Sequence, residues 1–311
     1  MVEMVATIIS DPNLVKKGEI IMTKADIYMK ESIEKILIEG YLDVNPRPKY
    51  KDGTPAHTLS INHTMRTYDL SNGEFPICTI RPMAWKTGIR EIFTIYQKPT
   101  NNLEEMREMG VNWWDDWDIG DGTIGQRYGA TVKRYDLINN LINDIKNDPY
   151  GRRKIVSLWQ ESDLHETAGL APCAFLTIWN VRNDGTGKEY LDMCLIQRSG
   201  DMLTASGAGG INEIQYAALL MMIARHCGYE AGVFTHFVAN EQIYDRHEEQ
   251  ALEMQRRANK LAIREYEHGE RKNPQLVLNP DKTNFYEMTI DDFTMENYEP
   301  MKPQLKLELG I

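Results

Sequence analysis

The sequence predicts a single α+β domain, in which a twisted, mixed or antiparallel sheet packs against long helices. Three observations favour this class. Two strand-like segments, 175–182 and 190–196, flank an Asp-Gly pair that is typical of hairpin turns. Several long segments have the apolar spacing of amphipathic helices. The strands and helices do not alternate in the regular order of a parallel sheet, and no repeat or flexible linker divides the chain.

The first half of the chain contains two predicted helices, a loop and a strand. Residues 25–40 carry apolar side chains at helical spacing and end at a glycine. Residues 45–55 hold three prolines and an Asp-Gly pair, which indicate a loop. Residues 75–80 are predicted to form a strand, and residues 85–96 are predicted to form a helix that contains Glu91.

The second half contributes the hairpin and the longest helices. The strongest helical signal is a segment rich in Ala, Leu and Met that is followed by Gly228, a residue type that commonly ends helices. An Asp-Pro-Tyr-Gly turn at 148–151 ends the helix before it. The predicted helices are 132–147, 212–227 and 248–267, and the further predicted strands are 154–159, 275–278 and 304–309.

The hairpin predicts a reactive site. If the chain folds about residues 184–187, Cys173 lies opposite Arg198, within a residue or two. A cation beside a cysteine favours the thiolate, which is the nucleophilic form. Arg198 and the neighbouring Ser199 also suit a phosphate group. A nucleophile beside a phosphate site indicates catalysis.

Composition limits the class of protein. The net charge of −11 argues against a nucleic-acid partner. The four cysteines form no Cys-X-X-Cys pair, so neither a zinc site nor a disulfide framework is expected. No apolar run is long enough to span a membrane, and the first residues lack the apolar core of a signal peptide. We therefore expect a cytoplasmic protein without a metal.

Several motifs follow one another along the chain. They are Asp-Gly-Thr-Pro-Ala-His-Thr-Leu-Ser at 52–60, Trp-Asp-Asp-Trp at 114–117, Gly-Thr-Ile-Gly-Gln-Arg-Tyr-Gly at 122–129, Arg-Arg at 152–153, Ala-Pro-Cys-Ala at 171–174, Gln-Arg-Ser-Gly-Asp at 197–201, Ile-Asn at 211–212 and Ile-Tyr-Asp-Arg at 243–246. Their order and approximate spacing resemble the thymidylate synthase family. The resemblance covers roughly residues 23–311, which leaves residues 1–22 as an N-terminal extension.

This resemblance implies a homodimeric enzyme with the thymidylate synthase fold that methylates dUMP to dTMP. The co-substrate would be 5,10-methylenetetrahydrofolate, which donates both the carbon and a hydride. Cys173 would add to C6 of uracil, because C5 is a poor nucleophile until the ring becomes an enolate. Asn212 would read the uracil edge by donating to O4 and accepting from N3–H.

The remaining site residues are likewise implied by the resemblance. The phosphate would be held by Arg198, Ser199, Arg47, and Arg152 and Arg153 from the partner subunit. Gln242 and Tyr244 would contact the sugar. Glu91, Tyr128 and ordered water would move protons, and Asp201 would belong to both the catalytic and the folate-binding groups. Trp114 would line the folate pocket, and the C-terminal Ile311 would close over it as a lid.

Three departures from the family pattern leave alternatives open. The segment 202–211 is longer and richer in glycine than the usual loop, Gln242 replaces a histidine, and Ala174 follows the nucleophile where many members have histidine. A pyrimidine-nucleotide hydroxymethylase, acting on dUMP or on CMP or dCMP, would share the early steps but add water instead of hydride. A non-catalytic nucleotide- or folate-binding protein is the alternative from another functional class.

Overall fold

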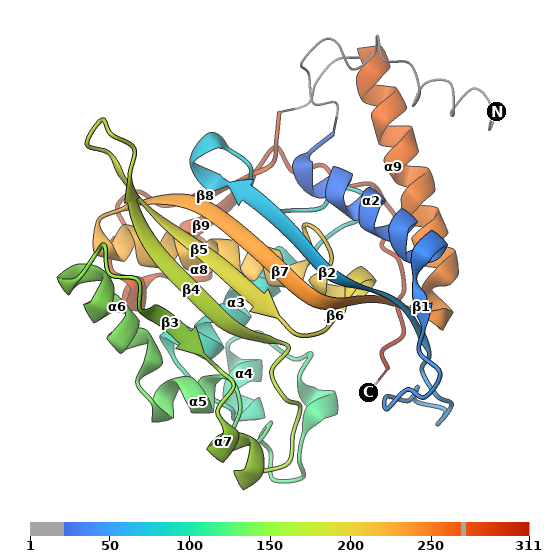
Figure 1. The fold of residues 1–311 in the computed structure, drawn as a ribbon, viewed down its shortest axis with the longest axis horizontal. Coiled ribbons are helices and arrows are strands. Elements are labelled where there is room, and N and C mark those ends of the chain that lie inside the picture. The colour runs from blue at the N-terminus through green and yellow to red at the C-terminus, as the bar shows by residue number, and fades with distance from the viewer. Residues whose placement is uncertain (1–21, 269–271, 311) are drawn as a thin grey trace.

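The computed structural model describes residues 22–268 and 272–310. The described residues form a seven-stranded sheet in the order β1-β2-β7-β5-β4-β3, with β6 beside β7, and a two-stranded sheet of β8 and β9 (Figure 1). Strands β5 and β6 run parallel to β7, whereas the other pairs are antiparallel, so the main sheet is mixed. The strands are β1 (Tyr41–Leu42), β2 (Thr58–Asp69), β3 (Lys154–Ser157), β4 (Ala174–Asn183), β5 (Glu189–Gln197), β6 (Gly200–Asp201), β7 (Glu230–Tyr244), β8 (Gln275–Leu278) and β9 (Phe293–Glu296).

The helices complete the α+β architecture that the sequence predicts. The α-helices are α2 (Lys24–Glu39), α3 (Trp85–Ile92), α4 (Leu103–Glu108), α5 (Gly129–Arg134), α6 (Leu137–Asn147), α7 (Glu161–Glu166), α8 (Ile211–Cys227) and α9 (Glu248–His268). Shorter helical segments are η1 (Leu70–Asn72), η2 (Phe93–Gln97), η3 (Asp115–Trp117), η4 (Met202–Ser206), η5 (Asp245–His247), η6 (Phe285–Glu287) and η7 (Ile290–Asp292).

Helix α8 lies at the centre of the core. Most of its side chains are buried, as expected for a helix enclosed by other elements on all sides. It packs against α3, β5 and β7, and lies behind the sheet in the view of Figure 1. Gly228 ends it in the left-handed conformation with φ of 84°, which confirms the predicted cap.

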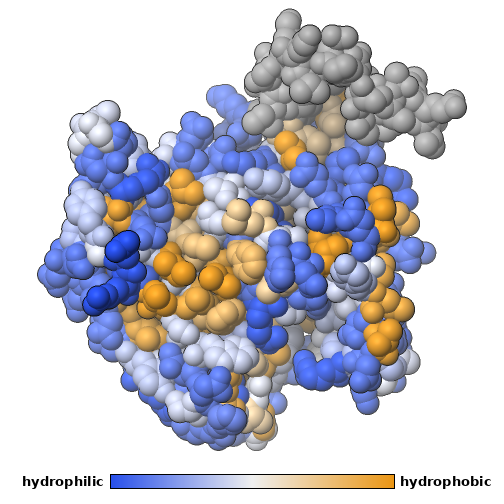
Figure 2. Space-filling model, viewed as in Figure 1, coloured by the Kyte–Doolittle hydropathy of each residue, from blue (hydrophilic) through white to orange (hydrophobic). Residues whose placement is uncertain are grey.

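The main sheet has two unlike faces. Thr177, Leu195 and Arg66 point towards the helices and are buried. On the opposite face Ile155 and Met65 are 53% and 67% exposed. Figure 2 shows apolar side chains gathered over the middle of this face, above β4, β5 and β7. One face of the sheet therefore supports the core, and the other presents an apolar surface.

Most of the predicted elements are confirmed. The helices predicted at 25–40, 212–227 and 248–267 correspond to α2, α8 and α9, and both strands of the hairpin are present. The strand predicted at 154–159 is shorter, and the helix predicted at 85–96 is α3 followed by η2.

Three predicted elements are wrong. Residues 75–80 are not a strand, because their backbone bonds elsewhere: Cys78 N–H donates to Gly209 O at 2.9 Å and Thr79 N–H to Asp26 at 2.7 Å. Residues 304–309 are not a strand either, since carbonyls of this segment accept from side chains of α9 and η5. The helix predicted at 132–147 is two helices, because Asp136 adopts the left-handed conformation with φ of 51°.

The long central strands β2 and β7 were not predicted. Their buried faces carry Arg66, His236 and Glu241, so neither segment shows the apolar alternation that identifies a half-buried strand. Arg66 donates to Glu241 and lies 3.3 Å from His236 Nδ1 in the core, an arrangement that a single strand cannot reveal.

Candidate active site

The hairpin brings Cys173 and Arg198 together. The Arg198 backbone N–H donates to the Cys173 carbonyl oxygen at 2.9 Å, and Arg198 Nη2 lies 3.5 Å from Cys173 Sγ. The predicted pairing is reached through a bulge, because the hairpin pairs Leu176 with Ile196 but Ala174 with Gln197. The body of the hairpin is thus one residue out of the predicted register, and the bulge restores that register beside Cys173.

The guanidinium of Arg198 is held rigidly. Its Nε donates to Pro172 O at 2.9 Å and its Nη2 to Ala171 O at 2.7 Å. Burial raises the pKa of the Cys173 thiol, while Arg198 and Arg47 act to lower it. The expected thiolate-favouring effect of Arg198 is therefore present, but burial outweighs it in this structure.

Tyr128, Trp114 and Glu91 form a cluster beside the hairpin. The Cys173 backbone N–H donates to Tyr128 Oη at 3.3 Å, and the rings of Tyr128 and Trp114 are 5.0 Å apart. Trp114 Nε1 donates to Glu91 Oε1 at 2.6 Å. Tyr128 has φ of 49° and ψ of −108°, an unfavourable backbone conformation of the kind found at functional sites. Three predicted site residues thus lie in contact with one another or with Cys173.

Glu91 is suited to exchange protons near neutral pH. Its side chain is buried, and this burial raises its pKa to about 7, although hydrogen bonds from Trp114 and Gln215 oppose the increase. A carboxyl group with a pKa near the working pH can both hold and release a proton. Glu91 is therefore a buried group and not a solvated charge on a helix face.

Asn212 lies at the start of α8 in a network that the sequence did not predict. Its Oδ1 accepts from Ser206 Oγ at 2.9 Å and faces Gln197 Nε2 at 3.3 Å. Its Nδ2 donates to Gln215 Oε1 at 3.0 Å, and Gln215 Nε2 in turn donates to Glu91. Both acceptor positions of the Asn212 oxygen are therefore taken in this structure. The spacing of Gln215, one helical turn after Asn212, was the available signal for this contact.

Tyr244, Gln242 and Asp201 lie together at the ends of β6 and β7. Asp201 pairs with Gln242 in the sheet. Burial raises the pKa of Tyr244 to about 12, with Asp201 and Cys173 adding to the increase and Arg47 opposing it. These influences place Arg47, which is exposed, near both Tyr244 and Cys173.

The C-terminal segment reaches this region. A Cβ atom added to Gly310 would lie 2.8 Å from the Tyr244 ring and 2.9 Å from Ala56, so the backbone passes close to both. His247 Nε2 lies 2.7 Å from Glu308 O, which anchors the same segment. Ile311 itself lies outside the described residues.

Comparisons with known proteins agree with this geometry. A model of the family described as thymidylate synthase matches residues 27–311. Thymidylate synthases from Lactococcus lactis subsp. cremoris and Streptococcus pneumoniae are each 48% identical over 292 and 293 residues, which is 93% of this chain and 100% of each relative. The solved structure of thermostable thymidylate synthase A from Bacillus subtilis has a TM-score of 0.79 and 32% identity, covering 92% of this chain and 99% of that chain. The chain belongs to the thymidylate synthase family.

Membership of the thymidylate synthase family decides whether this chain is an enzyme or a non-catalytic binding protein. The chain is an enzyme of the thymidylate synthase type, because its curated relatives carry that name over most of its length. The alternative of a non-catalytic binding protein is therefore wrong. The matching structure also confirms the thymidylate synthase fold.

Arg152 and Arg153 are not part of the site that this chain forms alone. Both are exposed and immediately precede β3, whose Lys154 pairs with Trp179 of β4. Arg153 therefore lies near Asn180, and at about 3.3 Å per strand residue it is roughly 20 Å from Cys173. Within a single subunit, these two arginines are therefore remote from Cys173.

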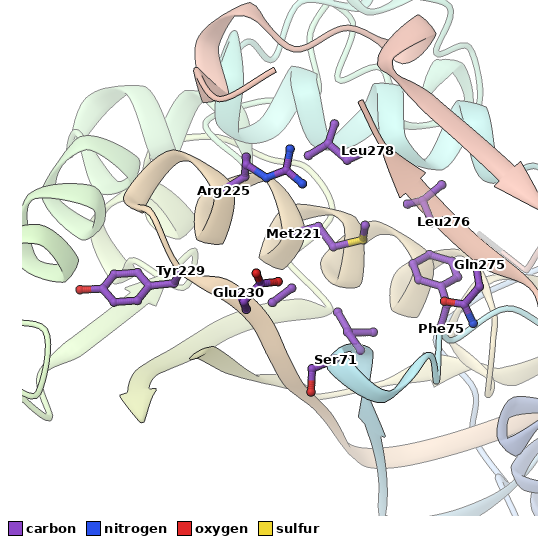
Figure 3. A pocket seen from close by; sticks show the side chains of 11 residues that line it. Ser71, Phe75, Met221, Arg225, Tyr229, Glu230, Gln275, Leu276 and Leu278 are labelled. Atoms are coloured by element: carbon purple, nitrogen blue, oxygen red, sulfur yellow. The ribbon is translucent and has the colours of Figure 1, made fainter. Parts of the chain in front are cut away.

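A separate cavity lies away from the predicted site. Figure 3 shows it between the C-terminal half of α8 and β8, with Met221, Arg225 and Leu276 among its lining residues. Its volume is about 220 Å³, and no predicted site residue lines it. Within residues 22–268 and 272–310, no group of three or more His, Cys, Asp or Glu side chains is arranged to hold a metal ion. None of the described helices is long and apolar enough to cross a membrane.

Proposed function

We propose that this enzyme converts dUMP to dTMP with 5,10-methylenetetrahydrofolate, through a covalent bond between Cys173 and C6 of uracil. The observation that supports it most is the position of Cys173 Sγ, 3.5 Å from Arg198 Nη2 and beside the Tyr128–Trp114–Glu91 cluster. This places a nucleophile, a cation and a proton-exchanging carboxyl group within one site.

Cys173 begins and ends the covalent sequence. Its sulfur adds to C6, and the electrons of the C5–C6 double bond move towards O4, so that C5 becomes nucleophilic. The sulfur leaves when the double bond re-forms in the product. Because burial raises the pKa of the thiol, the step depends on Arg198 and Arg47 to favour the thiolate.

The phosphate of dUMP is bound by clustered arginines. Arg198 lies beside Ser199, and Arg47 acts on the same thiol electrostatically. Guanidinium groups bind phosphate oxygens with paired hydrogen bonds, and a dianion requires several of them. In our proposal, Arg152 and Arg153 of the partner subunit complete this set, since both are exposed and remote from Cys173 within one chain.

A homodimer formed through the open sheet face would supply these arginines. Ile155 and Met65 on that face are 53% and 67% exposed, and Figure 2 shows the surrounding apolar surface. A large exposed apolar area on a sheet typically marks an interface. Because β3 lies at the edge of this sheet, Arg152 and Arg153 would lie at the border of the interface.

Asn212 reads the base, and Tyr244 with Gln242 contacts the sugar. The N–H of Asn212 that is not bonded to Gln215 donates to O4 of uracil. Gln242 substitutes for the usual histidine, because its amide can also donate or accept a hydrogen bond.

Reduced folate supplies the carbon and the hydride, and the chain has side chains that fit it. The Asp201 side chain accepts from Thr204 N–H at 3.3 Å, and burial raises its pKa. Donors of a pterin ring would oppose this effect, because hydrogen bonds to a carboxylate favour its charged form. Trp114 offers an aromatic surface. Glu91, with a pKa of about 7, moves a proton at N5 through water, and Tyr128 orients the water that removes the C5 proton. In our proposal Ile311, which lies outside the described residues, closes the site against water.

A product assay tests the proposal. The purified enzyme is given dUMP, dCMP or UMP with the folate, and the products are separated as methyl or hydroxymethyl nucleotides. We expect dTMP from dUMP. A hydroxymethyl product would instead support the alternative enzyme, in which water reaches the site. A stable adduct of 5-fluoro-dUMP and folate on the Cys173 peptide, detected by mass spectrometry, tests the covalent step.

The N-terminal extension of residues 1–22 and the cytoplasmic location both remain predictions. The division at residues 22 and 23 falls at the edge of the described part of the chain, and the family match begins at residue 27. A cytoplasmic location also remains a prediction.

A further inference from the structure

The loop between β6 and α8 holds the side chain of Asn212. Ser206 Oγ donates to Asn212 Oδ1 at 2.9 Å and accepts from Gln197 Nε2 at 2.7 Å. Gln197 Nε2 also faces Asn212 Oδ1 at 3.3 Å. Ser206 is buried, and its Oγ therefore acts within a dry, confined network. Two donors point at Oδ1, and Gln215 Oε1 accepts one N–H of Nδ2 at 3.0 Å, so the second N–H of Nδ2 is left to meet a ligand.

A buried charge cluster fixes this loop. We define the cluster as Arg66, Glu213, Glu241 and His236, whose side chains are at most 2% exposed. Arg66 Nε donates to Glu213 Oε1 at 2.6 Å, and Arg66 Nη1 donates to Glu241 Oε1 at 2.5 Å. Although burial would raise the pKa of Glu213, Arg66 and His236 lower it to about 2, so the carboxylate stays charged.

The cluster bonds directly to the loop backbone at two points. Arg66 Nη2 donates to Ser206 O at 2.8 Å, and Gly209 N–H donates to Glu213 Oε2 at 2.7 Å. Gly209 has φ of 62°, and a Cβ there would lie 2.3 Å from the Cys78 nitrogen, so only glycine allows this close contact. Buried ion pairs contribute little net stability on average. Their bonds to Ser206 and Gly209 indicate that this cluster serves to position the loop.

We propose that Ser206 is a specificity-determining residue that fixes the amide of Asn212 with its N–H group towards the base. This rests on the proposed function, in which Asn212 reads the pyrimidine. A donor at this position matches O4 of uracil and opposes the 4-amino group of cytosine. If the amide turned over, its oxygen would face the base and accept from the 4-amino group instead. Ser206 is a positioning residue here, because it acts through Asn212.

Replacing Ser206 with alanine removes the shorter of the two hydrogen bonds that hold Asn212 Oδ1, and leaves Gln197 Nε2 at 3.3 Å. We expect Ser206→Ala to lower the ratio of kcat/KM for dUMP to kcat/KM for dCMP about tenfold, since one buried hydrogen bond no longer distinguishes the two amide orientations. Ser162→Ala is the matched control, because it removes an exposed serine hydroxyl that bonds Tyr135 at 2.7 Å. The control should leave the ratio unchanged.

A double-mutant cycle shows whether Ser206 acts through Asn212. In the background of Asn212→Asp, which has no amide to turn over, Ser206→Ala should not change the ratio further. An equal fall in both backgrounds, or no fall in the wild-type background, would overturn the proposal. Circular dichroism confirms folding. If Ser206→Ala does not fold, Ser206→Cys decides, because a thiol is a weak donor of similar size and should give an intermediate ratio; a wild-type ratio there would overturn the proposal.

The same assays separate this proposal from the proposed function. Wild-type enzyme that makes no dTMP from dUMP contradicts the proposed function itself. Wild-type enzyme that makes dTMP, with an unchanged ratio in Ser206→Ala, contradicts only the role of Ser206.

Discussion

Glu91 should weaken the folded state at neutral pH, and replacing it with glutamine tests this. Its carboxyl group is buried, and burial raises its pKa from the ordinary 4.5 to about 7. Between these two values the folded protein binds a proton that the unfolded chain has released. The stability contributed by this proton is complete below pH 4.5 and is lost as the pH rises through about 7. Glu91→Gln removes the titrating group and therefore this dependence.

The size of the effect follows from the change in pKa. A difference of one pH unit corresponds to about 1.4 kcal/mol, so the interval from 4.5 to about 7 corresponds to about 3 kcal/mol. Glutamine also places an amide N–H opposite the donors from Trp114 and Gln215. That mismatch carries no charge and adds a constant at every pH, so it cancels when the pH dependences are compared.

The assay is urea unfolding of both proteins at a fixed protein concentration from pH 4.5 to pH 8.5. Relative to Glu91→Gln, the wild-type protein should lose about 3 kcal/mol of unfolding free energy across this range. A difference between the two proteins that does not vary with pH would refute the reasoning, because Glu91 would then titrate alike in the folded and unfolded chains. The wild-type enzyme should also show a group with a pKa of about 7 in the pH profile of kcat/KM, and Glu91→Gln should lack it.

Three other predictions concern the chemistry and the base. Cys173→Ala should abolish dTMP formation while dUMP still binds, measured by calorimetry, whereas Cys227→Ala should stay active; full turnover in Cys173→Ala would reject the mechanism. Mixing Cys173→Ala subunits with Arg152→Ala subunits should restore activity, because one site of the heterodimer then has both an intact thiol and an intact arginine. Confirmed heterodimers without activity would contradict a shared site. Asn212→Asp should lose dUMP activity and gain dCMP activity, changing the ratio of specificity constants tenfold to a hundredfold, or by about 1–3 kcal/mol; an unchanged ratio would mean that Asn212 does not read the base.

The sequence determined the elements that depend on residues close together in the chain. The Asp-Gly turn identified the hairpin that pairs Cys173 with Arg198, and the apolar spacing before Gly228 identified α8. The motif order also predicted the family that the comparisons confirm. These signals are local, because turn chemistry and helical periodicity are set within a few residues.

The tertiary structure alone decided which polar groups are buried together. Arg66, His236 and Glu241 hid the strands β2 and β7 from pattern analysis, because residues far apart in the chain neutralise and bond one another only after folding. The contacts of Ser206 and Gln197 with Asn212 arise in the same way. Burial, which reverses the expected pKa of Cys173 and raises that of Glu91, is a property of the packed site. It depends on every element around the group, and no short segment of sequence contains that information.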